Sequence, residues 1–176
     1  MYFINKFLER LIKMFKLFLT SDFTINHKYQ NKNQVTNSNA IIKLLSVRNF
    51  YPKYIIDVGC GYGEWTKKLI KVFPSSKYLL FDADKNNKSY LDVLKRKFVN
   101  INYKICLLSD DDNYYTFYNM GYGSSIFEEQ TRHPRKEENL RSTTLINEIT
   151  DELTKYNNNL IKIDVQGAEL KVLDGL

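Results

Sequence analysis

Tyr54-Ile55-Ile56-Asp57-Val58-Gly59-Cys60-Gly61-Tyr62-Gly63 is the stretch of sequence that decides the fold. Its first five residues form a short run of strand-forming character, and the glycines that follow allow a tight turn and a close approach of the backbone to a ligand. The spacing does not fit the dinucleotide fingerprint G-x-G-x-x-G, because the sixth position counted from Gly59 is Glu64. The Gly-Lys-Ser/Thr of a P-loop is also missing. An acid at the end of the strand repels a phosphate, so Asp57 suits a ligand that carries a positive charge.

Strands and helices alternate on the C-terminal side of this stretch. After the strand at 54–58, we expect strands over 77–81, 101–108, 114–118 and 160–165, and helices over 64–73, 88–98 and 142–155, with a further helix that begins at Ala168. This alternation predicts an α/β fold in which helices flank a parallel sheet. Ligands of such sheets bind at the carboxyl ends of the strands, where the glycines lie.

The pattern D-x-G-x-G-x-G resembles motif I of class I S-adenosylmethionine (SAM) methyltransferases. SAM carries an ammonium group and a sulfonium, which agrees with an acid in this loop. The resemblance implies a Rossmann-like class I methyltransferase fold with SAM as its cofactor. It also implies that Asp57, Gly59, Gly61 and Gly63 bind this cofactor.

Two further strand ends are candidates for the nucleoside part of that ligand. Asp82 closes the second predicted strand, 25 residues after Asp57, where a carboxylate can accept hydrogen bonds from both hydroxyls of a ribose. The alternative for Asp82 is an ordinary loop acid. Ser109 and Asp110 follow the third predicted strand, where polar residues of such folds meet the adenine, and Asp110 can equally be a turn residue.

The C-terminal part of the chain narrows the resemblance. The segment 162–175 reads K-I-D-V-Q-G-A-E-L-K-V-L-D-G and is similar to the signature of FkbM-family methyltransferases. The resemblance covers about residues 54–176. It implies SAM-dependent O-methylation, with a sugar hydroxyl of a glycan or a hydroxyl of a natural product as the acceptor.

Four residues are candidates for the chemistry or for contacts next to it. Asp164 follows the last predicted strand and could position or deprotonate the acceptor hydroxyl. Gln166 could hydrogen-bond the acceptor or the carboxylate of SAM. Glu169 begins a helix, where it is either catalytic or ties down the preceding loop. His133 lies in a charged loop and is either a base or a solvated side chain.

The charge of the chain is concentrated at its N-terminus. The net charge is +6, and residues 1–53 carry a balance of +7 while residues 54–176 carry −1. Apolar residues recur at helical spacing over 2–19, with lysines and arginines largely opposite them. Residues 1–19 could therefore lie on an anionic membrane surface, pack on the chain's own domain, or contact a partner subunit. A general drift toward lysine explains the charge equally well. We expect no specific nucleic-acid partner.

These observations predict how the chain is divided and where in the cell it acts. Residues 1–50 form a basic amphipathic arm, a linker and a short helix over 40–50, and residues 51–176 form the SAM-binding domain. No uninterrupted apolar run marks a signal or a membrane span, so we expect a cytoplasmic protein, either free or peripheral at the membrane. Two cysteines and two histidines are too few for a structural zinc or His-rich centre, and no metal site is expected.

The sheet predicted from this sequence is smaller than that of a full class I methyltransferase. The sequence supplies the first four main strands and one inserted strand, so we expect the domain to lack its C-terminal strands. The strand at 160–164 would then have an open edge, and activity would be poor. The alternative to an enzyme is a non-catalytic SAM-fold fragment or a module that binds a membrane or a partner.

Overall fold

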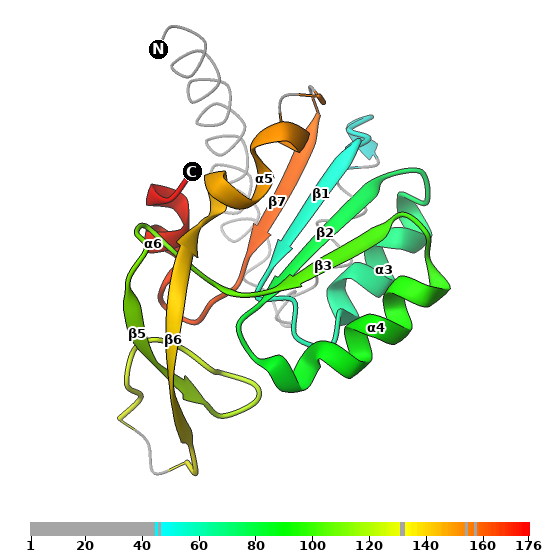
Figure 1. The fold of residues 1–176 in the computed structure, drawn as a ribbon. Helices are drawn as coiled ribbons and strands as arrows, with labels where there is room; N and C mark the ends of the chain where they lie inside the picture. Colours follow the sequence, from blue (N-terminus) through cyan, green and yellow to red (C-terminus); the bar gives the residue numbers. More distant parts are fainter. Residues whose placement is uncertain (1–44, 46, 131–132, 154, 157) are drawn as a thin grey trace, which may run out of the picture. The chain divides into compact units, whose positions relative to one another are not determined.

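The computed structural model describes residues 45, 47–130, 133–153, 155–156 and 158–176, and Figure 1 shows their fold. The elements are β1 (Tyr54–Val58), α3 (Glu64–Val72), β2 (Lys77–Asp82), a 3-10 helix η1 (Lys85–Asn87), α4 (Lys88–Lys97), β3 (Ile101–Ile105), β4 (Leu107–Ser109), β5 (Tyr114–Asn119), β6 (Lys136–Thr144), α5 (Leu145–Leu153), β7 (Asn159–Ile163) and α6 (Glu169–Asp174). Most of these elements agree with the sequence prediction to within two residues at each end. The arm over residues 1–19 lies outside the described residues, and of the helix expected over 40–50, positions 45 and 47 are described as helical.

The main sheet is parallel, with the strand order β3-β2-β1-β7. The chain moves outward from β1 to β3 on one side and then returns to place β7 on the other side of β1. This reversal is the switch point of a doubly wound α/β sheet, and it lies between β1 and β7. Among the described residues, β7 has β1 as its single strand neighbour.

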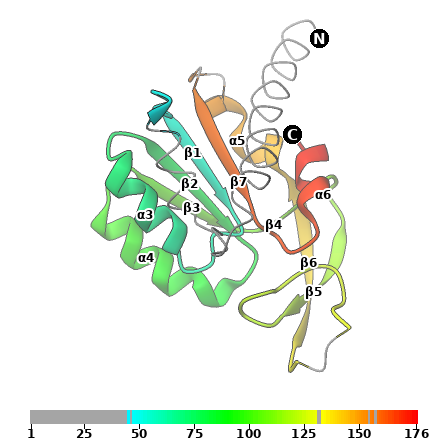
Figure 2. The same ribbon diagram turned by 180° about the vertical axis from the view of Figure 1, so that it is seen from behind.

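Helices flank this sheet, as Figures 1 and 2 show from opposite sides. The helices α3 and α4 lie on one face and α5 lies on the other. All five residues of β1 are buried, as are all but the first residue of β2. The strands at the centre of a parallel sheet are covered on both faces, which explains their nearly unbroken apolar sequences. The predicted α/β fold, a parallel sheet flanked by helices, is confirmed.

A second sheet of three strands, in the order β4-β6-β5, stands beside the main sheet. The strand expected over 101–108 is divided at Cys106 into β3 and β4, because β4 leaves β2 and pairs with β6 instead. Part of the helix expected over 142–155 is also strand, since β6 continues to Thr144 before α5 begins. β6 also pairs antiparallel with β5 over six residues, and this pairing stabilises β6 as a strand. The hydroxyl of Ser142 adds a hydrogen bond to the carbonyl of Asp111 (2.7 Å).

Candidate functional site

A cavity of about 290 Å³ lies at the carboxyl ends of β1 and β2, next to the switch point. Segments far apart in the sequence form its wall: the glycine loop, the end of β2 with the loop after it, the link from β3 to β4, the loop after β5 and the loop after β7. The residues that line it include Gly59, Cys60, Gly61, Tyr62, Glu64, Trp65, Asp82, Asp84, Cys106, Leu107, Leu108, Tyr122, Ser125, Lys162, Asp164 and Gln166.

The three glycines of the loop have positive φ angles (68°, 52° and 73°), but their surroundings differ. A Cβ on Gly59 would lie 2.0 Å from the carbonyl oxygen of Asp164, so this glycine lets the loop after β7 pack against it. A Cβ on Gly63 would lie 2.7 Å from Leu94 of α4. A Cβ on Gly61 would meet no atom within 4 Å. Gly61 is therefore the glycine of this loop that leaves space open at the cavity.

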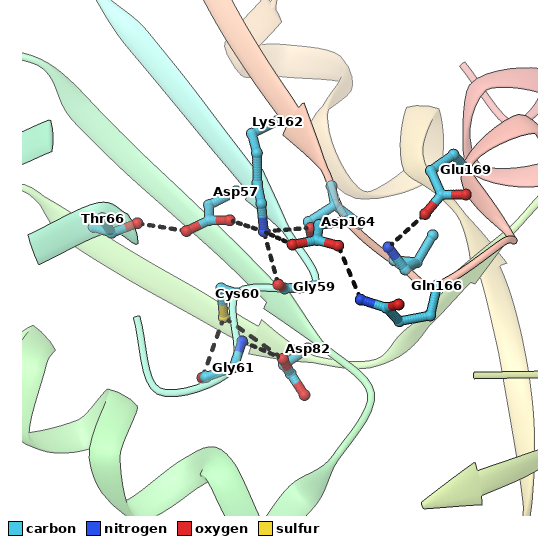
Figure 3. Close-up of polar contacts among 12 residues, drawn as sticks. Asp57, Gly59, Cys60, Gly61, Thr66, Asp82, Lys162, Asp164, Gln166 and Glu169 are labelled. Atoms are coloured by element: carbon cyan, nitrogen blue, oxygen red, sulfur yellow. Dashed lines mark hydrogen bonds and ion pairs between the residues drawn. The ribbon is translucent and has the colours of Figure 1, made fainter. Parts of the chain in front are cut away.

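Asp57 is completely buried and takes no part in the cavity wall. Its Oδ2 accepts a hydrogen bond from the hydroxyl of Thr66 (2.7 Å), and its Oδ1 lies 3.1 Å from Nζ of Lys162 (Figure 3). Burial raises the pKa of Asp57, while Lys162 and Thr66 act in the opposite direction. The sequence predicted a cationic ligand for the acid at the end of β1, whereas the cation beside Asp57 in this structure is the ammonium of Lys162.

Lys162 comes from β7 and joins the glycine loop to the loop after β7. Its ammonium donates to the carbonyl of Gly59 (2.9 Å) and also lies 3.5 Å from the carboxylate of Asp164 (Figure 3). Its side chain is 20% exposed and lines the cavity. Sequence reasoning did not assign Lys162 a role, although a lysine inside an otherwise apolar strand was a usable signal.

Asp82 is buried at the end of β2 and lines the cavity. Its Oδ2 accepts a hydrogen bond from the amide of Gly61 (2.6 Å), and its Oδ1 accepts from the amide of Asp84 (2.9 Å) and from Nδ2 of Asn87 (3.0 Å). Burial raises the pKa of Asp82 against the effect of these three hydrogen bonds. The carboxylate is thus fixed in place at the cavity, and Asn87 is a supporting residue that the sequence did not reveal.

Asp164 and Gln166 lie together at the switch-point side of the cavity. Nε2 of Gln166 donates a hydrogen bond to Oδ1 of Asp164 (3.1 Å), and both residues line the cavity. Gln166 has a φ of 52°, and the hydroxyl of Ser125 donates to its carbonyl oxygen (2.8 Å). The loop after β5 therefore holds the loop after β7, and it leaves the carboxylate of Asp164 exposed at the wall.

Glu169 stands outside the cavity wall and holds the backbone of the same loop. Its carboxylate accepts hydrogen bonds from the amide of Val165 (3.1 Å) and from the amide of Gly167 (3.0 and 3.2 Å). Both amides precede the N-cap residue Ala168 of α6, so the carboxylate holds the loop rather than the helix end. Of the two roles considered for Glu169, this geometry supports tying down the loop.

Three candidates from the sequence lie away from the cavity. Ser109 is buried and donates to Oδ1 of Asp110 (2.8 Å), and Asp110 accepts from Nζ of Lys171 on α6 (2.9 Å). The bond with Lys171 lowers the pKa of Asp110. Because the chain turns from β3 into β4, the cavity is lined here by residues 106–108 instead. His133 is exposed in the loop before β6 and does not line the cavity.

Two cysteine thiols and a group of aromatic rings complete the wall. Burial raises the pKa of Cys106 to about 12 and raises that of Cys60 well above its ordinary value, so both thiols stay protonated near neutral pH.

The ring of Tyr62 lies 4.5 Å from that of Tyr90 and 5.6 Å from that of Tyr122, centroid to centroid. Tyr122 is 81% exposed, so aromatic surface faces solvent beside the cavity.

Comparison with known proteins gives this geometry a context. Among solved structures, a similar one is coclaurine N-methyltransferase bound to N-methylheliamine and SAH; it is 17% identical, with a TM-score of 0.34. The match covers 44% of this chain and 24% of that enzyme, so the chain corresponds to about a quarter of its length. No curated protein sequence matches the chain. The sequence model of the family described as Methyltransferase FkbM domain matches residues 57–176, and the chain therefore belongs to the FkbM methyltransferase family.

Proposed function

We propose that this chain binds SAM in the cavity at the carboxyl ends of β1 and β2 and transfers its methyl group to a hydroxyl of a sugar, a glycan or a natural product. The single observation that carries the proposal is the pairing of Gly61 with Asp82. One wall of the cavity thereby combines an open backbone surface with a fixed carboxylate, in a chain of the FkbM family.

The residues present fit such a ligand. The cavity volume is close to the lower end of the range for small-molecule sites, about 300–1,000 Å³. Three N–H donors take three of the about four acceptor positions of the Asp82 carboxylate, so one position on Oδ2 remains for a ribose hydroxyl, beside the long contact of that oxygen with the thiol of Cys60 (3.9 Å). Leu107 and Leu108 offer an apolar surface to a base, and Tyr62 and Trp65 add aromatic surface. Four carboxylates in the wall, of Glu64, Asp82, Asp84 and Asp164, favour a cationic ligand.

Little covalent help from the protein is needed for the reaction. Bound SAM would supply an electrophilic methyl group, and the protein must align the acceptor oxygen with it. The exposed carboxylate of Asp164 can accept a hydrogen bond from the acceptor hydroxyl and take up its proton, while SAH would be the leaving group that keeps the sulfur's electron pair. Gln166 holds that carboxylate from one side, while Glu169 and Ser125 hold the loop. The exposed rings of Tyr62 and Tyr122 offer a surface on which an acceptor can rest.

The rival proposal is a non-catalytic module that retains the fold and binds a membrane or a partner. The residues described around the cavity favour catalysis, because Asp164 is held at the wall and is exposed rather than buried. Among the described residues, no helix combines the length and the apolar character needed to cross a membrane.

The experiment that separates the two proposals is a methyl-transfer assay with isotopically labelled SAM. A panel of acceptors presents hydroxyl groups on saccharides and on small aromatic natural products, with peptides and amines as controls. The enzyme proposal expects label in the hydroxyl acceptors, with loss of transfer in Asp164→Asn while SAH binding persists. Binding of SAH without transfer to any acceptor would support the non-catalytic module.

A further inference from the structure

The cavity wall has a marked charge imbalance. Four carboxylates line it, whereas Lys162 supplies its only positive charge among the described residues. A lone ammonium among acids has two possible roles, which are to neutralise those acids or to receive an anionic group of a ligand. The contacts of its three N–H groups distinguish these roles.

Two backbone carbonyls accept hydrogen bonds from the ammonium of Lys162. The bond to Gly59 is 2.9 Å long and the bond to Val58 is 3.4 Å long. The nitrogen also forms ion pairs with Oδ1 of Asp57 at 3.1 Å, without a hydrogen bond to that oxygen, and with Asp164 at 3.5 Å. Charge-assisted hydrogen bonds to carboxylates are usually about 2.7–2.9 Å long, so the third donor of Lys162 is available to a ligand.

The hydrogen bond to Gly59 and the ion pair with Asp57 also fix the position of Lys162. Asp57 is fully buried and is held on its other side by Thr66, so it cannot turn to a ligand itself. The ammonium is anchored beside Gly59, in the loop that wraps the proposed cofactor, and its side chain keeps 20% of its surface exposed. Asp57 therefore acts through Lys162, and it is the lysine that faces the cavity.

We infer that Lys162 binds the carboxylate at the amino-acid end of SAM and of its product SAH. The inference rests on the proposed function, and it names the residue that would distinguish a nucleoside with an amino-acid end from one without it. A ligand carboxylate would take the third N–H of Lys162 in place of its long contacts, while the contacts with Asp57 and Gly59 persist.

The test compares two probes in the full-length chain by calorimetry. SAH has the amino-acid carboxylate, and 5′-methylthioadenosine shares the nucleoside and the sulfur but lacks that end. The variant is Asp57→Asn/Lys162→Gln, in which two neutral amides can hydrogen-bond to each other, so that no buried charge is left unpaired. The ratio of the two affinities within each protein cancels general damage to the cavity, and a thermal melt confirms that the variant folds.

We expect the wild type to bind SAH more tightly than methylthioadenosine. The double variant should lose SAH affinity by about 10- to 100-fold, which is the effect of one hydrogen bond between charged groups. Its affinity for methylthioadenosine should stay within about twofold. Lys104→Gln is the matched control, because Lys104 lies in the same sheet and pairs with Glu148 outside this cavity. That variant should keep the wild-type ratio.

Two outcomes would overturn the inference, and they differ in what they say of the proposed function. An unchanged affinity ratio in the double variant, with both probes bound, would remove Lys162 as the carboxylate partner and leave SAM binding intact. Failure of the wild type to bind either probe would overturn the proposed function together with the inference.

Discussion

The amide nitrogen of Gly61 donates a 2.6 Å hydrogen bond to the carboxylate of Asp82. This contact joins the loop after β1 to the end of the neighbouring strand β2, so the open side of the glycine and the fixed acid belong to the same wall. Asn87 and the amide of Asp84 hold the other oxygen of Asp82. The cavity is therefore organised before any ligand arrives.

The raised pKa of Asp82 predicts a pH dependence of ligand binding. Burial favours the protonated form in the folded protein. Stability from this group therefore falls as the pH rises from 3.8, its ordinary value, to the raised pKa, and is level above it. The ionised carboxylate accepts ribose hydroxyls best, so SAH affinity should rise across the same window.

Calorimetry over a pH series checks this dependence, with Asp82→Asn as the control. The carboxylates of Asp84 and Asp164 also line the cavity, so the part of the pH dependence that belongs to Asp82 is the part that disappears in this variant. If SAH affinity changes with pH equally in wild type and Asp82→Asn, the pH dependence belongs to the other acids of the cavity.

Loss of the partner of Asp57 should destabilise the whole domain. In Lys162→Met the buried carboxylate has no opposite charge, and such a change costs about 3–5 kcal/mol in the free energy of unfolding. The double variant Asp57→Asn/Lys162→Gln should recover most of this loss. Urea unfolding measures the free energy of unfolding of both variants. If Lys162→Met is as stable as wild type, the ion pair between Asp57 and Lys162 does not stabilise the domain.

Glu169 should behave as a structural residue that holds the loop before α6. In Glu169→Ala the amides of Val165 and Gly167 lose their acceptor, which should lower stability by about 1 kcal/mol. For a chain of this size, that corresponds to a melting temperature lower by about 2–4 °C. Glu169→Gln retains an acceptor oxygen and should keep methyl transfer within about threefold of wild type. Transfer abolished in Glu169→Gln at an unchanged melting temperature would restore Glu169 as a catalytic residue.

The basic arm remains a separate prediction, since residues 1–19 lie outside the described part of the chain. The full-length protein should co-sediment with anionic vesicles more than with neutral ones, and salt should weaken this binding. Replacing Lys6, Lys13 and Lys16 with glutamine should remove the preference. Equal binding to both vesicle types would leave packing on this domain or on a partner subunit as the explanation.

The local signals in the sequence were sufficient for most of the main sheet. The apolar run of β1 and the glycines after it predicted both the strand and the ligand loop, and the acid at the end of β2 does line the cavity. These predictions depend on residues that are neighbours in the chain. They succeeded because a strand buried on both faces and a turn with positive φ angles each restrict the allowed residues locally.

The features that the sequence did not reveal depend on contacts between distant segments. The strand β6 is polar and charged in sequence, and it is defined by its pairing with β5 and β4. The direction in which Asp57 points depends on Lys162 from β7. Ser109 and Asp110 are separated from the cavity by the turn of the chain into the second sheet. No local pattern carries such information.

The measurement that tests the central claim most directly is calorimetric titration of SAH into wild type, Gly61→Ala and Gly61→Leu. All three share the loop, and the two variants share the strain of a side chain at a φ of 52°, so a comparison of alanine with leucine isolates the space that the side chain occupies. We predict saturable binding to wild type, weaker binding to Gly61→Ala and no detectable binding to Gly61→Leu, with both variants folded. Equal SAH affinity in wild type and Gly61→Leu would contradict the account, because the cavity beside Gly61 would then not be the cofactor site.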